Sequence, residues 1–414
     1  MQISVVDQLI FNGSNGITSI LIARGLGPYV FGEYIFVWGL IISVVTLQWA
    51  FLISPMTTIG PKQANETAHY YYGTVFLTQL LTSIALFLLV WLVLHSQANV
   101  LFRQIALPMA AATSLYSCQE FVRRYFFALQ TVKKVLIVDI IGSLSQVFIL
   151  FFCYWKHLFN IQMVLYIIAL TSFAAILWGV VNAGKLRLHH AHFKPTLKRN
   201  WNFGSWNVLN TTSGMVATQV EAILIKVFLG AAVFGGIRVI TNLGNLFLPV
   251  FQGIQNMLMP KASLILEQYG QTILARYLWR VSSMVVLLAL FILMPVCLFR
   301  SQLVMVLYGK AYLYYANFIP IQVFCLFLTL IRTTSVGLYL QTIEQVKFIF
   351  IFGAIDCVVS LMMLAYFIKH FHIQGVFLYW VINTLIILIG WVVYTLYISS
   401  NKETSVVEGA AVVE

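Results

Sequence analysis

Two stretches of the chain are closely similar: residues 20–32 read ILIARGLGPYVFG and residues 223–235 read ILIKVFLGAAVFG. Eight of the thirteen positions agree at a constant offset of 203, and the glycine pairs Gly27/Gly230 and Gly32/Gly235 are in register. A weaker echo links 129–131 (LQT) to 340–342 (LQT) at an offset of 211, which composition bias alone could produce. The longer match predicts an internal repeat, with one half of the chain duplicated in the other.

The composition excludes most soluble classes of protein. Apolar residues make up 61% of the chain and charged residues 9%, and the mean hydropathy is +0.92. A soluble domain has roughly 45–50% apolar and about 25% charged residues. A net charge of +12 in a soluble protein would suggest nucleic acid, but in so apolar a chain it indicates cytoplasmic loops and anionic lipid. We therefore expect an integral membrane protein with no nucleic-acid partner.

The apolar runs predict an all-α integral membrane fold of about twelve transmembrane helices, because a helix of about 20 residues spans a bilayer. The predicted spans are 3–24, 33–54, 72–95, 103–121, 135–155, 161–183, 205–228, 235–257, 279–299, 314–336, 347–368 and 374–398. The predicted parts of the chain are a six-helix lobe (1–183), a basic cytoplasmic linker (184–203), a second six-helix lobe (204–398) and a disordered cytoplasmic tail (399–414). The repeat predicts two pseudo-symmetric bundles around a central cavity, as in transporters.

The distribution of Lys and Arg predicts that both termini are cytoplasmic, since cytoplasmic loops are enriched in these residues. The connections on the side of the N-terminus hold most of them, and Arg123 and Arg124 are counted there. The opposite connections hold only Arg103, Lys156, Arg300, Lys310 and Lys369. No connection exceeds about 20 residues, which argues against a membrane enzyme with an extracytoplasmic catalytic loop.

The first repeated stretch resembles a family signature. Residues 23–28 (ARGLGP) followed by 31–34 (FGEY) are similar to the first-loop motif of the multidrug/oligosaccharidyl-lipid/polysaccharide exporter (MOP) superfamily, in particular of its Wzx-type O-antigen flippases. The resemblance implies a multi-pass protein of the bacterial plasma (inner) membrane that flips undecaprenyl-pyrophosphate-linked oligosaccharide, an O-antigen or capsular repeat unit, to the outer leaflet. It also implies proteins of lipopolysaccharide or capsule assembly as partners.

The first helix of each half is too polar to face lipid, because unsatisfied amides in hydrocarbon cost several kcal/mol each. Small residues could instead allow tight helix packing, but amides exceed what packing needs. We expect these side chains to line a shared cavity: Asn12, Asn15, Asn207, Asn210 and Gln219.

Three cations on the spans suit a pyrophosphate, since guanidinium gives bidentate contacts and ammonium a point charge. They are Arg24, Lys226 and Arg332. The alternatives are that Arg24 and Lys226 extend to the membrane interface and that Arg332 forms a structural ion pair.

Acids on the spans are candidates for ion coupling, because a buried carboxylate can bind a proton or sodium ion. They are Asp139, Glu221 and Asp356, each of which could instead balance a cation.

Glu120 is expected to pair with Arg123 and Arg124, one turn away. His189, His190 and His192 match no zinc-site spacing, so neither a metal nor a cofactor is expected.

These observations favour a flippase that works by alternating access. A cation-coupled multidrug exporter of the same superfamily is the first alternative, although a site for cationic drugs should be rich in acids. A membrane polysaccharide polymerase is the second, and the absence of a large outer loop and of paired loop carboxylates counts against it.

Overall fold

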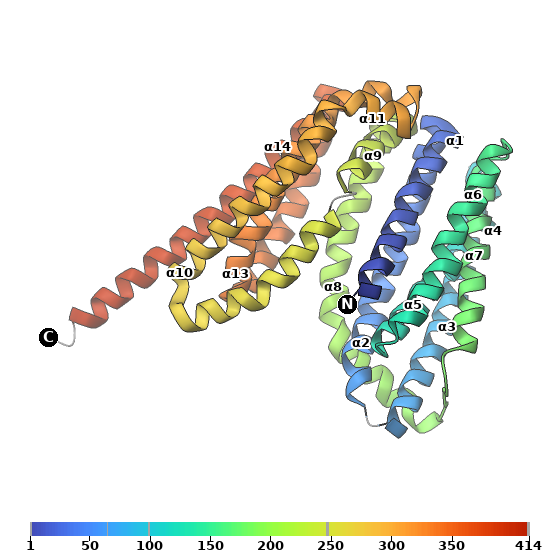
Figure 1. The fold of residues 1–414 in the computed structure, drawn as a ribbon, viewed down its shortest axis with the longest axis horizontal. Helices are drawn as coiled ribbons and strands as arrows, with labels where there is room; N and C mark the ends of the chain where they lie inside the picture. The colour runs from blue at the N-terminus through green and yellow to red at the C-terminus, as the bar shows by residue number, and fades with distance from the viewer. Residues whose placement is uncertain (1, 64, 98–99, 246–247, 412–414) are drawn as a thin grey trace. The chain divides into compact units, whose positions relative to one another are not determined.

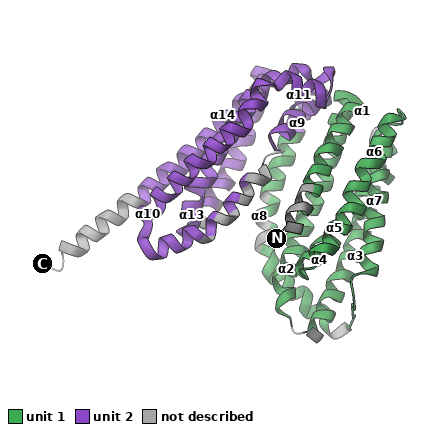
Figure 2. Cartoon of the chain, viewed as in Figure 1, with its two compact units in different colours: residues 1–222 green, residues 223–414 purple. Residues whose placement is uncertain are grey.

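The computed structural model describes residues 2–63, 65–97, 100–245 and 248–411, and in these residues the chain forms helices and no strand. An apolar chain in lipid must satisfy its backbone hydrogen bonds internally, which a helix does within one segment. The chain divides into two compact units, Met1–Ala222 and Ile223–Glu414 (Figure 2). Each unit is described by itself.

Unit 1 contains seven α-helices and most of an eighth, joined by short π- and 3-10-helical turns (Figure 1). Its elements are α1 (Gln2–Gln48), a π-helical turn (Trp49–Ile53), α2 (Ser54–Ile59), a 3-10 turn (Gly60–Lys62), α3 (Asn65–His95), α4 (Val100–Ala128), α5 (Val132–Asp139), a second π-helical turn (Ile140–Leu144), α6 (Ser145–Trp155), α7 (Ile161–Val181) and α8 (His190–Leu229) as far as Ala222.

Unit 2 begins in the last two turns of α8 and continues through six further α-helices. These elements are α9 (Ala231–Asn245), α10 (Leu248–Leu298), α11 (Arg300–Leu307), a 3-10 helix (Lys310–Phe318), α12 (Ile319–Ile331), a π-helical turn (Arg332–Gly337), α13 (Leu338–Thr342) and α14 (Val346–Ala411).

The prediction of an all-helical, two-lobed membrane protein is confirmed. Helices α1, α10 and α14 each contain a non-helical residue, Gly27, Gly270 and His372 respectively, which divides each into two rods. With these rods counted separately, the described residues accommodate the twelve expected helices. Seven helical stretches are long and apolar enough to cross a membrane on their own. Helices α4 and α8 are not among them, because both carry many polar residues.

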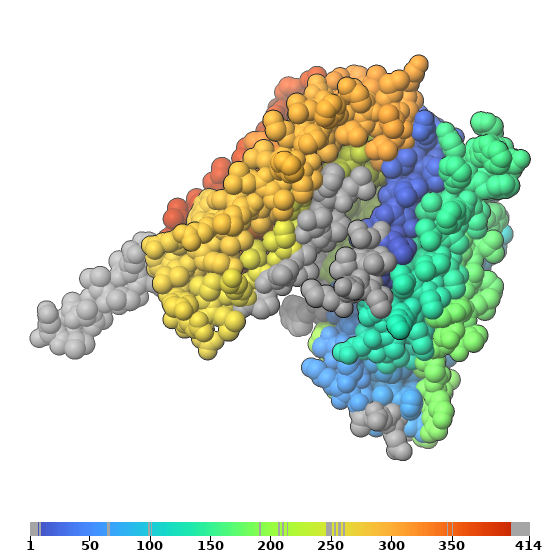
Figure 3. Space-filling view, in the orientation of Figure 1, coloured from blue at the N-terminus to red at the C-terminus, as the bar shows by residue number. Residues whose placement is uncertain are grey.

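The core of unit 1 is built around α4, which packs against α3 and α7. Phe121, Val122, Tyr125 and Phe126 of α4 are all buried, and a Cβ at Gly179 of α7 would overlap Val122. Apolar residues also lie on the outside: Phe148, Phe151 and Phe152 of α6 are exposed, and Figure 3 shows this helix (turquoise) at the surface of the unit. Exposed apolar side chains on such a surface are those expected to face lipid.

The repeat is visible in the backbone at the end of the first rod of α1 and at the end of α8. Gly27 has a φ of 73° and Gly230 a φ of 87°, and these two glycines are the pair already aligned by the sequence match. This left-handed region favours glycine, which has no Cβ to clash with the backbone. Gly25 of the same motif is needed for a different reason, because a Cβ there would overlap the ring of Phe159.

Two further turns recur in the two units. Gln130 (φ 56°) and Glu344 (φ 63°) occupy turns with the same hydrogen bonds, since the amides of Thr131 and Gln345 each donate to the carbonyl oxygen five residues earlier. The structure thus aligns Gln130 with Glu344, whereas the weaker sequence echo aligned it with Gln341. The register of the echo was therefore wrong, because its second copy lies in the last turn of α13 and not in the turn that follows.

The predicted linker lies along unit 1. The amide of Arg187 donates to the carbonyl oxygen of His69 in α3 (3.2 Å), beside Gly73, where a Cβ would overlap Arg187. The hydroxyl of Tyr71 donates to Oδ1 of Asn200 (3.0 Å). Helix α8 then continues through residues 203 and 204, and the division between the two units falls at Ala222 and Ile223.

Helix α14 runs to Ala411, but the side chains from Ser399 onward lie outside the described residues. The predicted disorder of the tail 399–414 stays a prediction, as do the cytoplasmic location of the termini and the central cavity.

Gly27 provides a test of the bend in α1. Its φ of 73° and ψ of 172° fall in a region that only glycine adopts readily. Gly27→Ala should therefore lower the free energy of unfolding by about 1–3 kcal/mol. Gly13→Ala is the matched control, because Gly13 is helical and, like Gly27, has open space around its Cβ position. Thermal unfolding of the purified protein in detergent would measure both, and equal stability of the two variants would contradict the assignment.

Candidate functional site

A cluster of three charged side chains lies inside unit 1. The guanidinium of Arg123 in α4 donates through Nε to both carboxylate oxygens of Asp139 (2.8 and 2.9 Å) and through Nη2 to Oδ2 of Asp7 (3.2 Å). The side chains are 1%, 0% and 0% exposed, in the order Arg123, Asp139, Asp7. This cluster, Asp7–Arg123–Asp139, joins α1, α4 and α5.

Aromatic rings enclose the guanidinium. Its central carbon lies 4.0 Å from the ring centroid of Phe11 and 5.3 Å from that of Phe127. A cation over an aromatic face is attracted by the ring quadrupole, most strongly away from water. The cluster has one guanidinium for two carboxylates, and Oδ1 of Asp7 has no hydrogen-bond partner. Fully ionised, it carries a net charge of −1.

Asp139 ends α5 directly before the π-helical turn Ile140–Leu144. A single π-helical turn within an α-helix is rare and is frequent at functional sites. Within this turn, Gly142 lies against the amide of Gln119 in α4, where a Cβ would overlap it. The glycine of the turn therefore allows α4 to approach closely beside Asp139.

The structure corrects the sequence analysis at Arg123. The span was ended at residue 121 and Arg123 was counted as a loop residue, but α4 continues to Ala128 because Tyr125 and Phe126 are buried in the core. Glu120 interacts with both arginines, as expected. Its Oε2 lies 3.7 Å from Nε of Arg124, and its charge also acts on Arg123, whose hydrogen bonds go to the two aspartates.

Sequence reasoning missed Asp7 altogether as a site residue. One signal was available: Asp7, Arg123 and Asp139 are charges flanked by apolar residues, and charges in such segments are usually paired. For Asp139, the structure shows the alternative in which it balances a cation; a role in coupling stays a prediction.

A second polar network in unit 1 was also not anticipated. Nε2 of Gln48 donates to Oε1 of Gln79 (2.7 Å) and to the carbonyl oxygen of Ser117 (3.0 Å). Nε2 of Gln79 donates to Oγ of Ser83 (2.8 Å), which in turn lies 2.9 Å from Sγ of Cys118. The network joins α1, α3 and α4 near the core of the unit.

In unit 2 the structure brings two predicted residues, Arg332 and Asp356, within electrostatic reach of each other. Arg332 is the first residue of the π-helical turn Arg332–Gly337, and its guanidinium carbon lies 5.2 Å from the ring centroid of Trp391. Its buried Nε has no hydrogen-bond partner. Arg332 therefore has both a neighbouring acid and a donor available for an anion.

Some of the polar side chains of the first helix are buried inside unit 1, and others are only half-buried. Ser14 and Thr18 are buried, and Thr18 accepts a hydrogen bond from Nε2 of Gln146 (3.3 Å). Asn12 and Asn15 are half-buried. Packing within unit 1 explains Ser14 and Thr18. For Asn12 and Asn15, lining of a cavity stays a prediction.

The predicted residues of α8 have different surroundings. Nε2 of Gln219 donates to Oγ of Ser43 (2.7 Å) and to the carbonyl oxygen of Gly39 (3.0 Å), so this amide ties α8 to the second rod of α1. The side chains of Asn207 and Asn210 lie outside the described residues.

The remaining predicted residues lie near the ends of the first helix of each half. Arg24 is exposed in unit 1, Glu221 is half-buried in the same unit, and Lys226 is half-buried in unit 2. Their roles as ligands for pyrophosphate or for a coupling ion stay predictions.

The described side chains include no group of three or more His, Cys, Asp or Glu that could hold a metal ion. His189 and His192 lie instead against Tyr70, and the rings of Tyr70 and His192 are stacked with centroids 5.0 Å apart. His190 is outside the described side chains.

Arg123 can be tested by its stability effect. Arg123→Ala should lower the free energy of unfolding by about 3–5 kcal/mol, because it leaves two buried carboxylates without a cation. Arg124→Ala is the matched control and should cost about 1 kcal/mol or less, since Arg124 is 36% exposed and its partner is 3.7 Å away. Thermal unfolding in detergent measures both.

The same test has a rescue arm. The triple variant Asp7→Asn, Arg123→Met, Asp139→Leu removes all three charges and should recover most of the lost stability. If Arg123→Ala were as stable as Arg124→Ala, the cluster would not hold unit 1 together.

Comparison with known proteins places the fold. No protein-family model and no curated protein matches the sequence. Solved structures do match. An inward-facing multidrug resistance MATE family transporter of the MOP superfamily aligns with a TM-score of 0.75 at 15% identity, covering 96% of each chain.

Two further structures give the same result. A MOP superfamily transporter from Pyrococcus furiosus, described as having a binding pocket of reverse polarity, aligns with a TM-score of 0.62 at 14% identity over 96% of this chain and 94% of that one. An outward-facing MATE family transporter aligns with a TM-score of 0.60 at 16% identity over 97% and 94%. The chain therefore has the fold of the MATE transporters of the MOP superfamily.

Proposed function

We propose that this protein is a flippase that moves a polyprenyl-pyrophosphate-linked oligosaccharide from the cytoplasmic to the outer leaflet of a bacterial plasma membrane by alternating access. The fold supports transport, because the structures that it resembles are transporters and include inward-facing and outward-facing forms. The substrate is argued from charge. The sugar head would cross through a polar path while the prenyl chain stays in lipid.

The observation that carries the choice of substrate is the pairing of acids with arginines. Asp7 and Asp139 lie against Arg123, Glu120 against Arg124, and Asp356 near Arg332, each within its own unit. A cationic substrate would have to displace an arginine from these acids. Arg332, in contrast, has a buried Nε without a hydrogen-bond partner, which suits an anionic pyrophosphate.

A multidrug exporter is the second candidate, and it is favoured by two of the matched structures, which are multidrug resistance transporters. At 15–16% identity those matches show the fold and not the substrate. Deleting the gene would remove surface polysaccharide in one case and the export of cationic drugs in the other, so one experiment separates the two candidates.

Deleting the gene should leave lipid-linked oligosaccharide on the inner leaflet and abolish surface polysaccharide. A probe confined to the outer face of spheroplasts would locate the lipid-linked sugar. Normal glycan display with greater retention of cationic dyes would show the multidrug exporter instead. Unpolymerised units accumulating on the outer face would indicate a polymerase.

Arg332 is the sharpest single-residue test of the anionic site. Arg332→Gln should lower flipping by at least about tenfold, as expected for the loss of a charge-assisted hydrogen bond. Arg280→Gln is the control, because Arg280 is an exposed cation of the same unit and should flip normally. Flipping by the purified variants in proteoliposomes measures both. Wild-type flipping by folded Arg332→Gln would refute the role of this residue.

Ion coupling is a second part of the proposal and concerns the cluster Asp7–Arg123–Asp139. Its net charge of −1 would be neutralised by one proton or one small monovalent cation at the free oxygen of Asp7. Asp139→Asn removes that excess charge. Flipping by the wild type should then respond to an imposed proton or sodium gradient, and flipping by Asp139→Asn should not. An equal response of both would place coupling elsewhere.

A further inference from the structure

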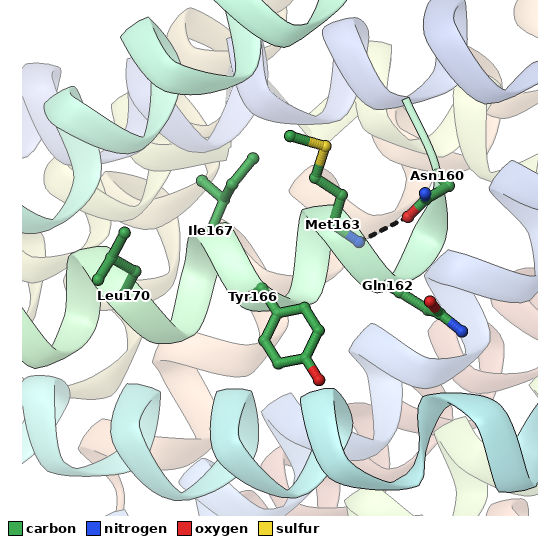
Figure 4. A pocket seen from close by; sticks show the side chains of 6 residues that line it. All are labelled: Asn160, Gln162, Met163, Tyr166, Ile167 and Leu170. Carbon is green, nitrogen blue, oxygen red and sulfur yellow. Dashed lines mark hydrogen bonds between the residues drawn. The ribbon is translucent and has the colours of Figure 1, made fainter. Parts of the chain in front are cut away.

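Two grooves occupy corresponding places in the two units. In unit 1 a groove of about 300 Å³ follows the start of α7 and is lined by Asn160, Gln162, Met163, Tyr166, Ile167 and Leu170 (Figure 4). In unit 2 a groove of about 620 Å³ lies between α12 and the second rod of α14; its lining is Phe318, Pro320, Ile321, Phe324, Phe371, Gln374, Phe377, Leu378 and Val381. We call them the α7 groove and the α12/α14 groove.

The correspondence follows from the backbone. His157 (φ 54°) is the left-handed residue shortly before α7, and His372 (φ 50°) is the left-handed residue that divides α14. When these two histidines are aligned, Met163 of the α7 groove corresponds to Leu378 of the α12/α14 groove, and Tyr166 corresponds to Val381. The two grooves therefore share one corresponding helix face, and the α12/α14 groove has in addition a wall from α12.

The two grooves differ in chemistry. Three of the six residues of the α7 groove are polar: Asn160, Gln162 and Tyr166. Asn160 also caps α7, accepting a hydrogen bond from the amide of Met163 (2.7 Å), as the dashed line in Figure 4 shows. The α12/α14 groove is twice as large, and among the described residues that line it only Gln374 is polar. Only the second groove is suited to a hydrocarbon chain.

The α12/α14 groove is open at the surface of unit 2. Phe324 and Phe371 are each 48% exposed and Leu378 is 39% exposed, while the rings of Phe318 and Phe377 are stacked 4.4 Å apart. An exposed apolar groove on a membrane-spanning helix pair is in contact with lipid. Its occupant is therefore drawn from the bilayer itself.

Phe371, which lines this groove, has cationic and hydrogen-bonding neighbours in the sequence. Lys369, His370 and His372 flank Phe371, in the bend that divides α14, and Lys369 and His370 are exposed. In unit 1 the equivalent turn has Lys156, whose Nζ lies 5.0 Å from the ring centroid of Trp155. Basic residues beside a cleft between transmembrane helices are suited to an anionic lipid headgroup.

We infer that the α12/α14 groove is a binding site for an anionic phospholipid of the surrounding bilayer, with an acyl chain in the groove and the phosphate at Lys369. The site is separate from the path proposed for the transported substrate and does not depend on what that substrate is. It would anchor the bend of α14 at the membrane interface. The α7 groove, smaller and more polar, holds no acyl chain.

Native mass spectrometry of the purified protein tests this, using phosphatidylglycerol and phosphatidylcholine with identical acyl chains. The wild type should retain one phosphatidylglycerol in preference to phosphatidylcholine. Leu378→Trp should fill the groove and lower the bound fraction by at least about tenfold. Met163→Trp, at the corresponding position of the α7 groove, should bind as the wild type does.

A milder pair of variants separates the chain from the headgroup and guards against misfolding. Lys369→Gln should remove the preference for phosphatidylglycerol while phosphatidylcholine still binds, and Ile321→Gln should weaken both lipids equally. Equal losses in Leu378→Trp and Met163→Trp, or an unchanged preference in Lys369→Gln, would overturn the inference. Displacement of phosphatidylglycerol by an equimolar prenyl phosphate would also overturn it, because the groove would then belong to the substrate path.

Discussion

Arg123 cannot lie in the interior of unit 1 unless both aspartates meet it there. The desolvation of a guanidinium costs more free energy than one poorly aligned partner offsets, so its burial requires several well-placed acceptors. Asp139 supplies two acceptor oxygens and Asp7 a third. Because these residues come from α4, α5 and α1, their meeting sets the rotation and the height of three helices at once. Other contacts depend on that register: Val122 faces Gly179 of α7, and the hydroxyl of Tyr125 reaches the carbonyl oxygen of Ala183 (2.6 Å).

Unit 2 has the same backbone plan without the same charges. When the turns at Gln130 and Glu344 are aligned, Arg123 corresponds to Gly337. Gly337 lies under the ring of Trp391, and the cation of that region, Arg332, lies about one turn earlier over the same ring. Duplication has preserved the turns and left the side chains free to diverge, so the two units can bind different groups with one architecture.

The sequence predicts the parts of this fold that depend on apolar length and on glycine. Spans of about 20 apolar residues and a repeated Gly27/Gly230 pair are local features, and both appear in the structure. Where a polar helix ends depends on residues that are distant in the sequence. Hydropathy falls at Arg123, yet the helix continues, because carboxylates from α1 and α5 compensate the charge of Arg123. Gln219 shows the same limit, since nothing near it in the sequence reveals that it bonds Ser43 in a distant helix.

The two candidate functions differ in the charge that the binding site must have and not in the fold. The matched transporters are 14–16% identical to the present chain, so they show its fold and not its substrate. One matched MOP transporter is itself described as having a binding pocket of reverse polarity, which indicates that charge varies on this scaffold. In the present chain Asp7, Asp139 and Asp356 lie beside arginines, and a cationic ligand would have to compete with a covalently tethered guanidinium at high local concentration. An anionic ligand at Arg332 also has a competitor in Asp356, but the buried Nε of Arg332 has no hydrogen-bond partner and is available to the ligand.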